Sequence, residues 1–181
     1  MLLRILKSFV IIGFAFGSTA AFAAAQQPQA TPQRAAPAPS GEAPSGKTPK
    51  ATAEGTEKGQ LKSPYADFAK VADEGHKKFM AAGCNGCHGG GGGGGMGPPL
   101  TNEVWIYGKD DDTLFRLVAL GSDGLKAHGY ARKGSENVVG PMPAMGEVVK
   151  TDDDMWKIIA WIRSVNPSSA SASAASPPPA E

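Results

Sequence analysis

Two cysteines and a histidine lie within five residues, in the run Cys84-Asn85-Gly86-Cys87-His88. Cysteines at this spacing serve as a thiol–disulfide pair, as zinc ligands or as attachment points for haem. A redox pair of the thioredoxin type needs a βαβ pattern, which the sequence lacks, and gives His88 no role. A zinc site needs a second pair of ligands, and the other histidines, His76 and His128, do not form one. The C-x-x-C-H spacing therefore predicts covalent haem attachment.

All three side chains of the motif have a role in this chemistry. The thiols of Cys84 and Cys87 add across the two vinyl groups of one haem, and each forms a thioether bond. The next residue, His88, then presents its imidazole to the iron as an axial ligand. No thiol is left for a disulfide within the chain, because the sequence holds two cysteines in total.

The N-terminus has the pattern of a secretory signal peptide. Arg4 and Lys7 precede the apolar run from Phe9 to Phe16, and Ala21-Phe22-Ala23 fits the small-x-small cleavage rule. The apolar run is too short and too rich in Ala, Gly and Ser to favour a retained membrane anchor. We therefore expect residues 1–23 to be removed on export to the periplasm, which leaves no membrane span in the mature chain.

The charge of the mature chain argues against a nucleic-acid partner. Removal of residues 1–23 takes away two basic and no acidic residues, so the formal net charge changes from +1 to −1. Binding to phosphates needs a clustered basic face, and this balance does not provide one.

Composition divides the rest of the chain into a small domain and two polar ends. Residues 24–62 are rich in Pro, Ala, Gly, Ser and Thr, and Leu61 is their only large apolar residue. Such a segment buries too little apolar surface to offset its backbone entropy, which predicts a disordered linker. The same argument predicts a disordered tail over 167–181. Residues 63–166 remain as one domain, small enough to benefit from a bound haem at its centre.

The first predicted helix of this domain begins at Ser63 with Pro64 at its first helical position, and it ends before Gly83. Its inward face has the 3.6-residue period and consists of Phe68, Ala72, Gly75 and Phe79. Glycine inside a helix costs about 1 kcal/mol relative to alanine. Gly75 therefore indicates a close crossing with another helix.

Two further helices complete the predicted secondary structure. One spans Asp112 to Leu120, with acidic residues in its first turn and Gly121 just past its end. The other is capped by Thr151 and runs to Arg163, with an amphipathic stripe at Met155, Ile158, Ile159 and Ile162. No strand pattern is present, so the predicted fold class is all-α with long loops.

The order of these parts resembles a class I cytochrome c, and the resemblance covers residues 64–166. Gly75 and Phe79 match the family's N-terminal helix, and Trp161 matches the C-terminal helix that crosses it. The resemblance implies three main helices and long loops around one covalent haem. Gly97-Pro98-Pro99-Leu100 resembles the family's Gly-Pro-x-Leu, which implies that the Pro98 carbonyl accepts a hydrogen bond from the axial His88.

Electron transfer requires a sixth ligand to the iron, and seven side chains qualify by type. They are Met80, Met96, Met142, Met145, Met155, His76 and His128. Met80 precedes the motif too closely, Met155 belongs to an apolar stripe, and Met96 is expected on the histidine side. Met142 and Met145 remain. The run from Met142 to Gly146 resembles the family's Met-Pro-x-aromatic-Gly, which implies Met142 as the ligand, with Met145 as the alternative.

Seven consecutive glycines, Gly89 to Gly95, separate the motif from the Gly-Pro-x-Leu segment. They lack the Gly-Lys-Ser/Thr ending and the preceding strand of a phosphate-binding loop. We expect a flexible loop near the haem; the alternative is a surface that lets a partner approach closely.

A haem iron with His and Met ligands has no position open for substrate, which predicts a one-electron carrier rather than an enzyme. The alternatives are a haem subunit of a larger oxidoreductase complex, or a haem enzyme or sensor with a displaceable sixth ligand. No distal His or Arg constellation supports the enzyme.

Several motifs also resemble methanol-metabolism-related cytochromes of the c553i type. They are the glycine run with Pro98 to Asn102, Trp105 to Gly108, Arg132 to Gly134, and Val139 to Pro143. This resemblance implies a periplasmic quinoprotein (methanol or alcohol) dehydrogenase as the electron donor, with a downstream cytochrome or oxidase of the respiratory chain as the acceptor. The loop 121–140, which carries Lys126, His128, Arg132 and Lys133, is either the docking element or a solvated charged loop.

Overall fold

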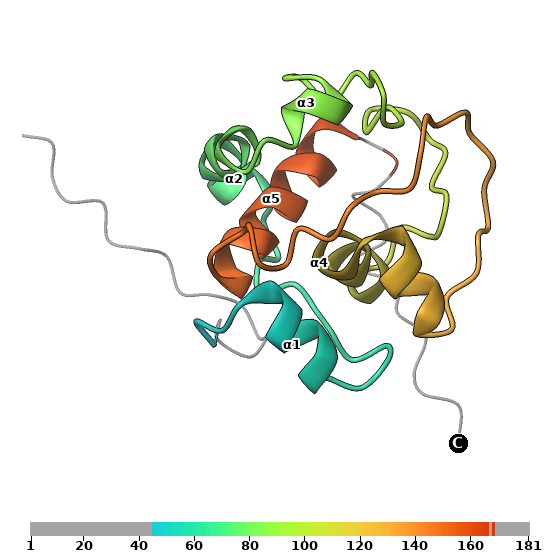
Figure 1. The fold of residues 1–181 in the computed structure, drawn as a ribbon. Helices are drawn as coiled ribbons and strands as arrows, with labels where there is room; N and C mark the ends of the chain where they lie inside the picture. The colour runs from blue at the N-terminus through green and yellow to red at the C-terminus, as the bar shows by residue number, and fades with distance from the viewer. Residues whose placement is uncertain (1–44, 167, 169–181) are drawn as a thin grey trace, which may run out of the picture. The chain divides into compact units, whose positions relative to one another are not determined.

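The computed structural model describes residues 45–166 and residue 168. These described residues form five helices joined by long loops (Figure 1), in the order α1 (Pro49–Gly55), α2 (Ala69–Ala81), α3 (Asn85–His88), α4 (Asp111–Ala127) and α5 (Asp152–Val165). The described residues contain no strand, so the predicted all-α class is confirmed. None of the described helices is long and apolar enough to cross a membrane. The predicted signal peptide, residues 1–23, lies outside the described residues.

Helices α2 and α5 cross in direct backbone contact at Gly75, as the sequence predicts. A Cβ atom on Gly75 would lie 1.9 Å from the carbonyl oxygen of Lys157, so no larger residue fits. Beside this contact the rings of Phe79 and Trp161 pack with their centroids 4.3 Å apart. The crossing thus places two aromatic side chains at the centre of the domain.

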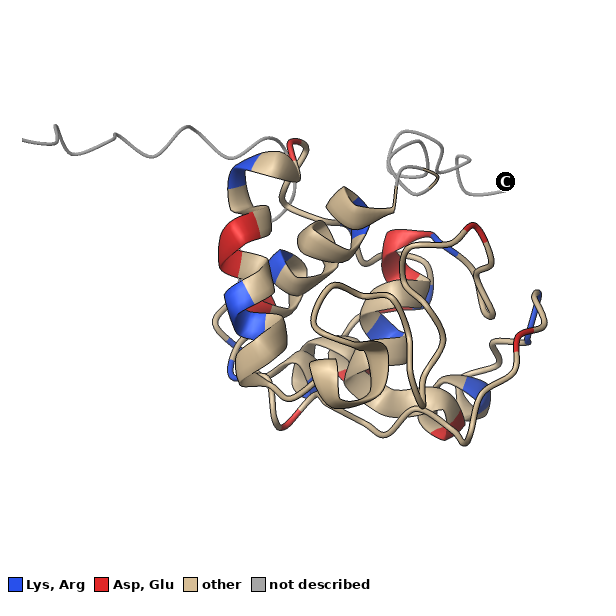
Figure 2. Cartoon of the chain, turned by 90° about the horizontal axis from the view of Figure 1, so that it is seen from above, with Lys and Arg blue, Asp and Glu red and all other residues tan. Residues whose placement is uncertain are grey.

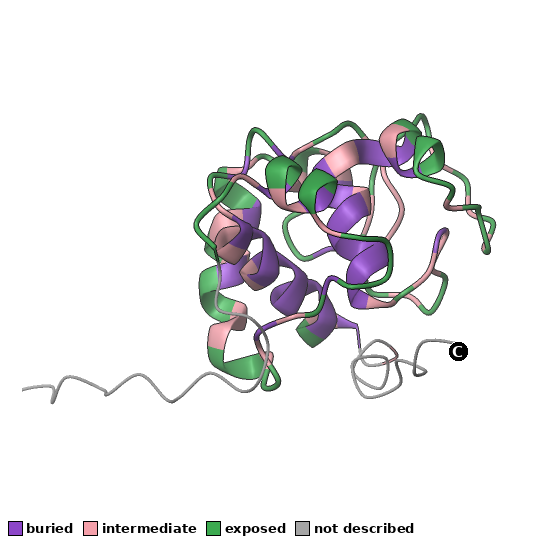
Figure 3. Cartoon of the chain, turned by 90° about the horizontal axis from the view of Figure 1, so that it is seen from below, coloured by how far each residue is buried: buried purple, intermediate pink, exposed green. Residues whose placement is uncertain are grey.

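Helix α5 begins as predicted. The Thr151 hydroxyl accepts a hydrogen bond from the Asp154 N–H at 3.1 Å and caps the helix. The predicted stripe is buried, with Met155, Ile158 and Ile159 at most 1% exposed. Buried residues lie mainly along α4 and α5 (Figure 3), which therefore form most of the core.

Helix α4 is longer than predicted. It is capped by Asp110, whose carboxylate accepts a hydrogen bond from the Thr113 N–H, and it continues to Ala127 rather than ending at Leu120. Gly121 does interrupt the helix, because it adopts φ 72° and ψ 175°. The chain then resumes a helical course, so this glycine makes a kink where the sequence predicts an end.

The predicted start of α2 is wrong. Ser63 and Pro64 precede the helix, which begins at Ala69 with Phe68 as its N-cap. The Ser63 side chain accepts a hydrogen bond from the Tyr65 N–H at 3.2 Å and closes a local turn. Its own N–H donates to the Asp111 carboxylate at 2.9 Å. Ser63 therefore fastens the chain to α4 instead of capping α2.

The predicted disorder of residues 24–62 is wrong for residues 45–62. This stretch contains α1, and it buries Pro49, Ala53 and Leu61. The prediction counted large apolar residues, whereas small ones and backbone hydrogen bonds to buried charged side chains hold the segment. Residues 24–44 and, apart from residue 168, the predicted tail 167–181 lie outside the described residues.

Replacement of Gly75 by Ala should separate α2 from α5. The added Cβ would meet the Lys157 carbonyl, so the backbone must move, and we expect a loss of at least about 2 kcal/mol of unfolding free energy. Urea unfolding of the haem-loaded protein measures it. Gly55→Ala is the matched control, because nothing lies within 4 Å of its added Cβ. Equal stability of the two variants would contradict the crossing.

Acid should weaken the fold through Asp112. Burial alone would raise the pKa of this carboxyl, but hydrogen bonds from Arg116, Tyr130 and the Leu61 N–H outweigh burial and lower the pKa. A pKa below that of the unfolded chain gives stability that is present above about pH 4 and is lost as pH falls toward the folded-state pKa.

We therefore expect Asp112→Asn to lower the free energy of unfolding at neutral pH and to flatten its decline in acid. Urea unfolding across the acid range measures both effects. Asp73→Asn, which alters an exposed carboxylate on α2, is the control and should leave the decline as it is. An unchanged slope in Asp112→Asn would rule out this origin of the acid sensitivity.

Candidate haem-binding site

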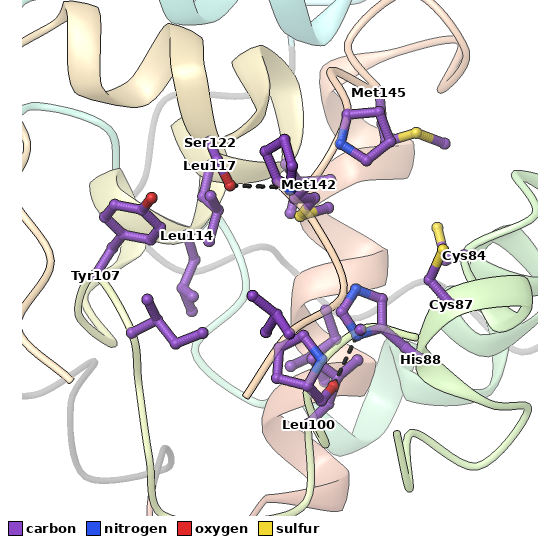
Figure 4. Close-up of a pocket in the computed structure, with 18 of the residues that line it drawn as sticks. Cys84, Cys87, His88, Leu100, Tyr107, Leu114, Leu117, Ser122, Met142 and Met145 are labelled. Atoms are coloured by element: carbon purple, nitrogen blue, oxygen red, sulfur yellow. Dashed lines mark hydrogen bonds between the residues drawn. The ribbon is translucent and has the colours of Figure 1, made fainter. Parts of the chain in front are cut away.

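A cavity of about 810 Å³ opens between α4, α5 and the loops that connect the helices (Figure 4). Its walls are mainly apolar and include Phe79, Leu100, Leu114, Val118, Ile158 and Ile162. The residues singled out by the sequence also line this cavity: Cys84, Cys87, His88, Pro98, Met142 and Met145. The fold therefore brings every predicted site residue to one cavity.

The short helix α3 presents the C-x-x-C-H motif. Its turn is closed by hydrogen bonds from the N–H groups of Cys87 and His88 to the Cys84 carbonyl, at 3.2 and 3.0 Å. Both thiols are free, and burial raises the pKa of the Cys84 thiol. A reactive redox cysteine has a lowered pKa, so the raised pKa of Cys84 does not favour the thioredoxin alternative.

The His88 imidazole is held in one orientation by Pro98. Its Nδ1 atom lies 2.9 Å from the Pro98 carbonyl oxygen (Figure 4). Since a carbonyl only accepts, Nδ1 carries the proton and Nε2 keeps its lone pair for a metal. Gly97 packs against the ring, because a Cβ there would lie 3.0 Å from the imidazole Cε1. The predicted Pro98 contact is thus present.

The glycine run forms a folded turn beside the motif. The Gly94 N–H donates to the His88 carbonyl at 2.8 Å, and the Leu100 N–H donates to the Gly92 carbonyl at 2.7 Å. Gly92 is buried at φ 76°, and a Cβ there would lie 3.5 Å from the Trp161 ring. We expected a flexible loop, but backbone hydrogen bonds and packing on α5 give this one a defined course.

The methionine loop, residues 141–146, lies along α4. The Met142 N–H donates to the Ser122 hydroxyl at 3.0 Å, and the Ser122 N–H donates to the Met142 carbonyl at 2.9 Å. The kink at Gly121 makes this approach possible, because a Cβ there would lie 2.7 Å from the Met142 carbonyl oxygen. In the view of Figure 4, Met142 and Met145 lie above the His88 imidazole.

Four of the other ligand candidates do not line the cavity. Met155 is fully buried in the core, and Met80 is 43% exposed on α2. His76 stacks on Trp161 and lies within hydrogen-bonding distance of the Gly90 carbonyl, while His128 is exposed and contacts Gly124. Met96 is 56% exposed and does line the cavity, next to the Gly97 contact with His88.

The residues of this cavity fit a covalently attached haem. Apolar walls suit a porphyrin, and the thiols of Cys84 and Cys87 can bond to it. The oriented His88 imidazole and the methionine sulfurs of Met142 and Met145 come from different sides. A bound haem c supplies a one-electron ferric–ferrous couple. Cys84 and Cys87 would hold the group, and His88 would bind its iron through Nε2. In the described part of the chain, no group of three or more His, Cys, Asp or Glu side chains is arranged so that it could hold a metal ion.

Residues 72–166, more than half of the chain, match the family model described as Cytochrome c. The chain therefore belongs to the cytochrome c family. Its helical architecture is the class I fold, and its cofactor is one covalent haem c, for which Cys84 and Cys87 supply the attachment motif. Membership makes the protein a haem-based electron carrier. No match was found among curated proteins.

Sequence reasoning missed three residues that shape the site. Ser122 anchors Met142 from twenty positions away, and no local pattern marks such a contact. Gly97 was identified only as part of the Pro98 motif, although its missing side chain gives the imidazole room. Gly121 was interpreted as a helix end, whereas its conformation admits the methionine loop.

Proposed function

We propose that the protein is a periplasmic one-electron carrier whose haem iron is bound by His88 and Met142. The observation that carries this proposal is that both side chains line one apolar cavity, each held by a neighbour. Pro98 orients the imidazole, and Ser122 fixes the Met142 backbone at both its N–H and its carbonyl. Two protein ligands complete the iron's coordination, so the site binds no substrate and serves electron transfer.

The cavity wall supports a high reduction potential. Thioether ligation favours the ferrous state relative to a second imidazole. The apolar walls disfavour the extra positive charge of the ferric state, which acts in the same direction. A carrier of this kind accepts electrons readily from a reduced dehydrogenase.

Replacement of Met142 by Ala should remove the sixth ligand. We expect the ferric protein to lose the weak far-red absorption band that Met ligation produces, and the reduction potential to fall. Met145→Ala is the matched control, because Met145 also lines the cavity; it should keep the band. Loss of the band in Met145→Ala but not in Met142→Ala would reverse the ligand assignment.

The proposed electron donor is a periplasmic quinoprotein dehydrogenase for methanol or another alcohol, and the acceptor is a downstream cytochrome or oxidase of the respiratory chain. The motif resemblance to methanol-metabolism-related cytochromes supports this donor. The structure places Lys126 in the last turn of α4 and Arg132 in the loop that follows the helix; both line the cavity and are exposed, with Lys133 exposed next to Arg132. Figure 2 shows charges of both signs spread over the described elements. We therefore assign the steering of the donor to the basic side chains beside the cavity and not to the charge of a whole face.

Docking of such a donor should depend on ionic strength, because weak redox encounters rely on screened surface charges. We expect added salt to slow the reduction of the ferric protein by a purified quinoprotein dehydrogenase. The double variant Arg132→Glu and Lys133→Glu should slow it by about tenfold at low salt. Lys77→Glu, an exposed charge change on α2 outside the cavity, is the control. Slow reduction that is insensitive to salt would exclude this donor.

A further inference from the structure

The N-terminal segment, residues 45–62, packs on the outer side of the methionine loop. Helix α1 contacts both α4 and α5 (Figure 1), and Ala53 is fully buried against them. The Lys50 N–H donates to the Gly146 carbonyl at 3.3 Å. The segment thus contacts the residue that ends the methionine loop, although the match to the cytochrome c family begins only at residue 72.

Two buried charges fasten this segment to α4. The Arg116 guanidinium, 2% exposed, donates to the carbonyls of Thr56 and Glu57 at 2.7 and 2.8 Å and also to the Ala53 carbonyl. The Ala53 carbonyl lies in the last turn of α1, and the other two carbonyls directly follow the end of the helix at Gly55. The Asp112 carboxylate in turn accepts a hydrogen bond from the Leu61 N–H at 3.1 Å. Without the segment both charges would lose buried partners, which is costly.

A third buried group fastens the other end of the segment to α5. The Asp152 carboxylate, 3% exposed, accepts hydrogen bonds from the N–H groups of Ser45 and Gly46 at 3.0 and 3.1 Å. The Asp152 N–H donates to the Lys47 carbonyl at 2.9 Å. The segment is therefore fixed on both sides of the point where it meets the loop.

Gly146 lies between α1 and α4 with no room for a side chain. Its N–H donates to the Ala119 carbonyl of α4 at 3.0 Å. A Cβ on Gly146 would lie 2.6 Å from that carbonyl oxygen and 2.9 Å from the backbone nitrogen of Lys50. The methionine loop is thus anchored to α4 at Met142 through Ser122, and at Gly146 through Ala119 with α1 on top.

We propose that residues 45–62 act as a positioning element for the methionine loop: α1 holds Gly146 against α4 and so keeps the thioether of Met142 in the cavity. The ligand role of Met142 rests on the function proposed above, whereas the docking of the loop does not. None of the hydrogen bonds described above joins the segment directly to His88 or Met142. Loosening it should therefore free the loop while the domain stays folded.

Full-chain, haem-loaded variants test this with two matched pairs. Ala53→Glu puts a carboxylate into the buried face of α1, and Ala51→Glu puts the same group on its exposed face. Gly146→Ala overfills the α1–α4 contact, and Gly140→Ala has nothing within 4 Å of its added Cβ. In each pair the first variant disturbs the contact and the second does not.

Hydrogen exchange of three amides reports the docking of the loop directly. The N–H groups of Ser122, Met145 and Gly146 donate to carbonyls of Met142, Val118 and Ala119. We expect them to exchange about tenfold faster in Ala53→Glu and Gly146→Ala than in the control variants, because the loop opens locally. The amides of α5 beyond Asp152, whose own N–H donates to the Lys47 carbonyl of the segment, should keep their protection.

Binding of added imidazole to the ferric protein reports the effect on the ligand. Apparent affinity rises in proportion to the fraction of molecules in which the methionine has left the iron. We expect about tenfold tighter imidazole binding in Ala53→Glu and Gly146→Ala, with little change in the controls. A segment that only stabilised the whole domain would not produce this change.

The proposal would be overturned by unchanged exchange of the three loop amides, or by faster exchange that appears equally in α5. Faster loop exchange with unchanged imidazole affinity would also overturn it, since the ligand would then be independent of the segment. A wild-type protein without the far-red band would instead refute Met142 ligation. The exchange rates would still decide whether α1 holds the loop.

Discussion

The direct backbone contact between Gly75 and Lys157 is the constraint on which the site depends. Helix α2 leads into α3 after three residues, so the position of α2 fixes where the two thiols face the cavity. Helix α5 supplies the opposite part of the wall through Ile158 and Ile162. Because no side chain separates the two backbones, the distance between attachment motif and wall is set by main-chain contact. This distance does not depend on interlocking side chains, which can repack more easily than two backbones in contact.

The methionine side of the cavity depends on a second close approach of backbones. There the kink at Gly121 lets the loop reach α4, and Gly146 lets α1 close over it. The histidine side is instead held within one stretch of chain, by Pro98 and the glycine turn. One ligand is thus positioned by local sequence and the other by contacts between distant segments, so the two sides should respond differently to changes elsewhere in the fold.

This difference explains how far the sequence could predict the structure. The attachment motif, the Pro98 contact and the Thr151 cap are local patterns, and all three were predicted. The Gly75 crossing was predicted because glycine in a helix interior has a cost that needs a reason. The order of residues 45–62 was not, because Arg116, Asp112 and Asp152 supply the partners from far along the chain. Composition counts apolar area and cannot register such hydrogen bonds. The choice of Met142 over Met145 came from family resemblance, and both side chains line the cavity.

The glycine turn also has a practical consequence for electrochemistry. Gly91 and Gly93 are exposed, adopt backbone angles open to other residues and have nothing within 4 Å of an added Cβ. Both lie within five residues of His88, on a turn whose hydrogen bonds use main-chain atoms. A lysine or a bioorthogonal side chain introduced there could tether the protein to an electrode by a short path to the haem. The buried Gly92 between them would have to remain glycine.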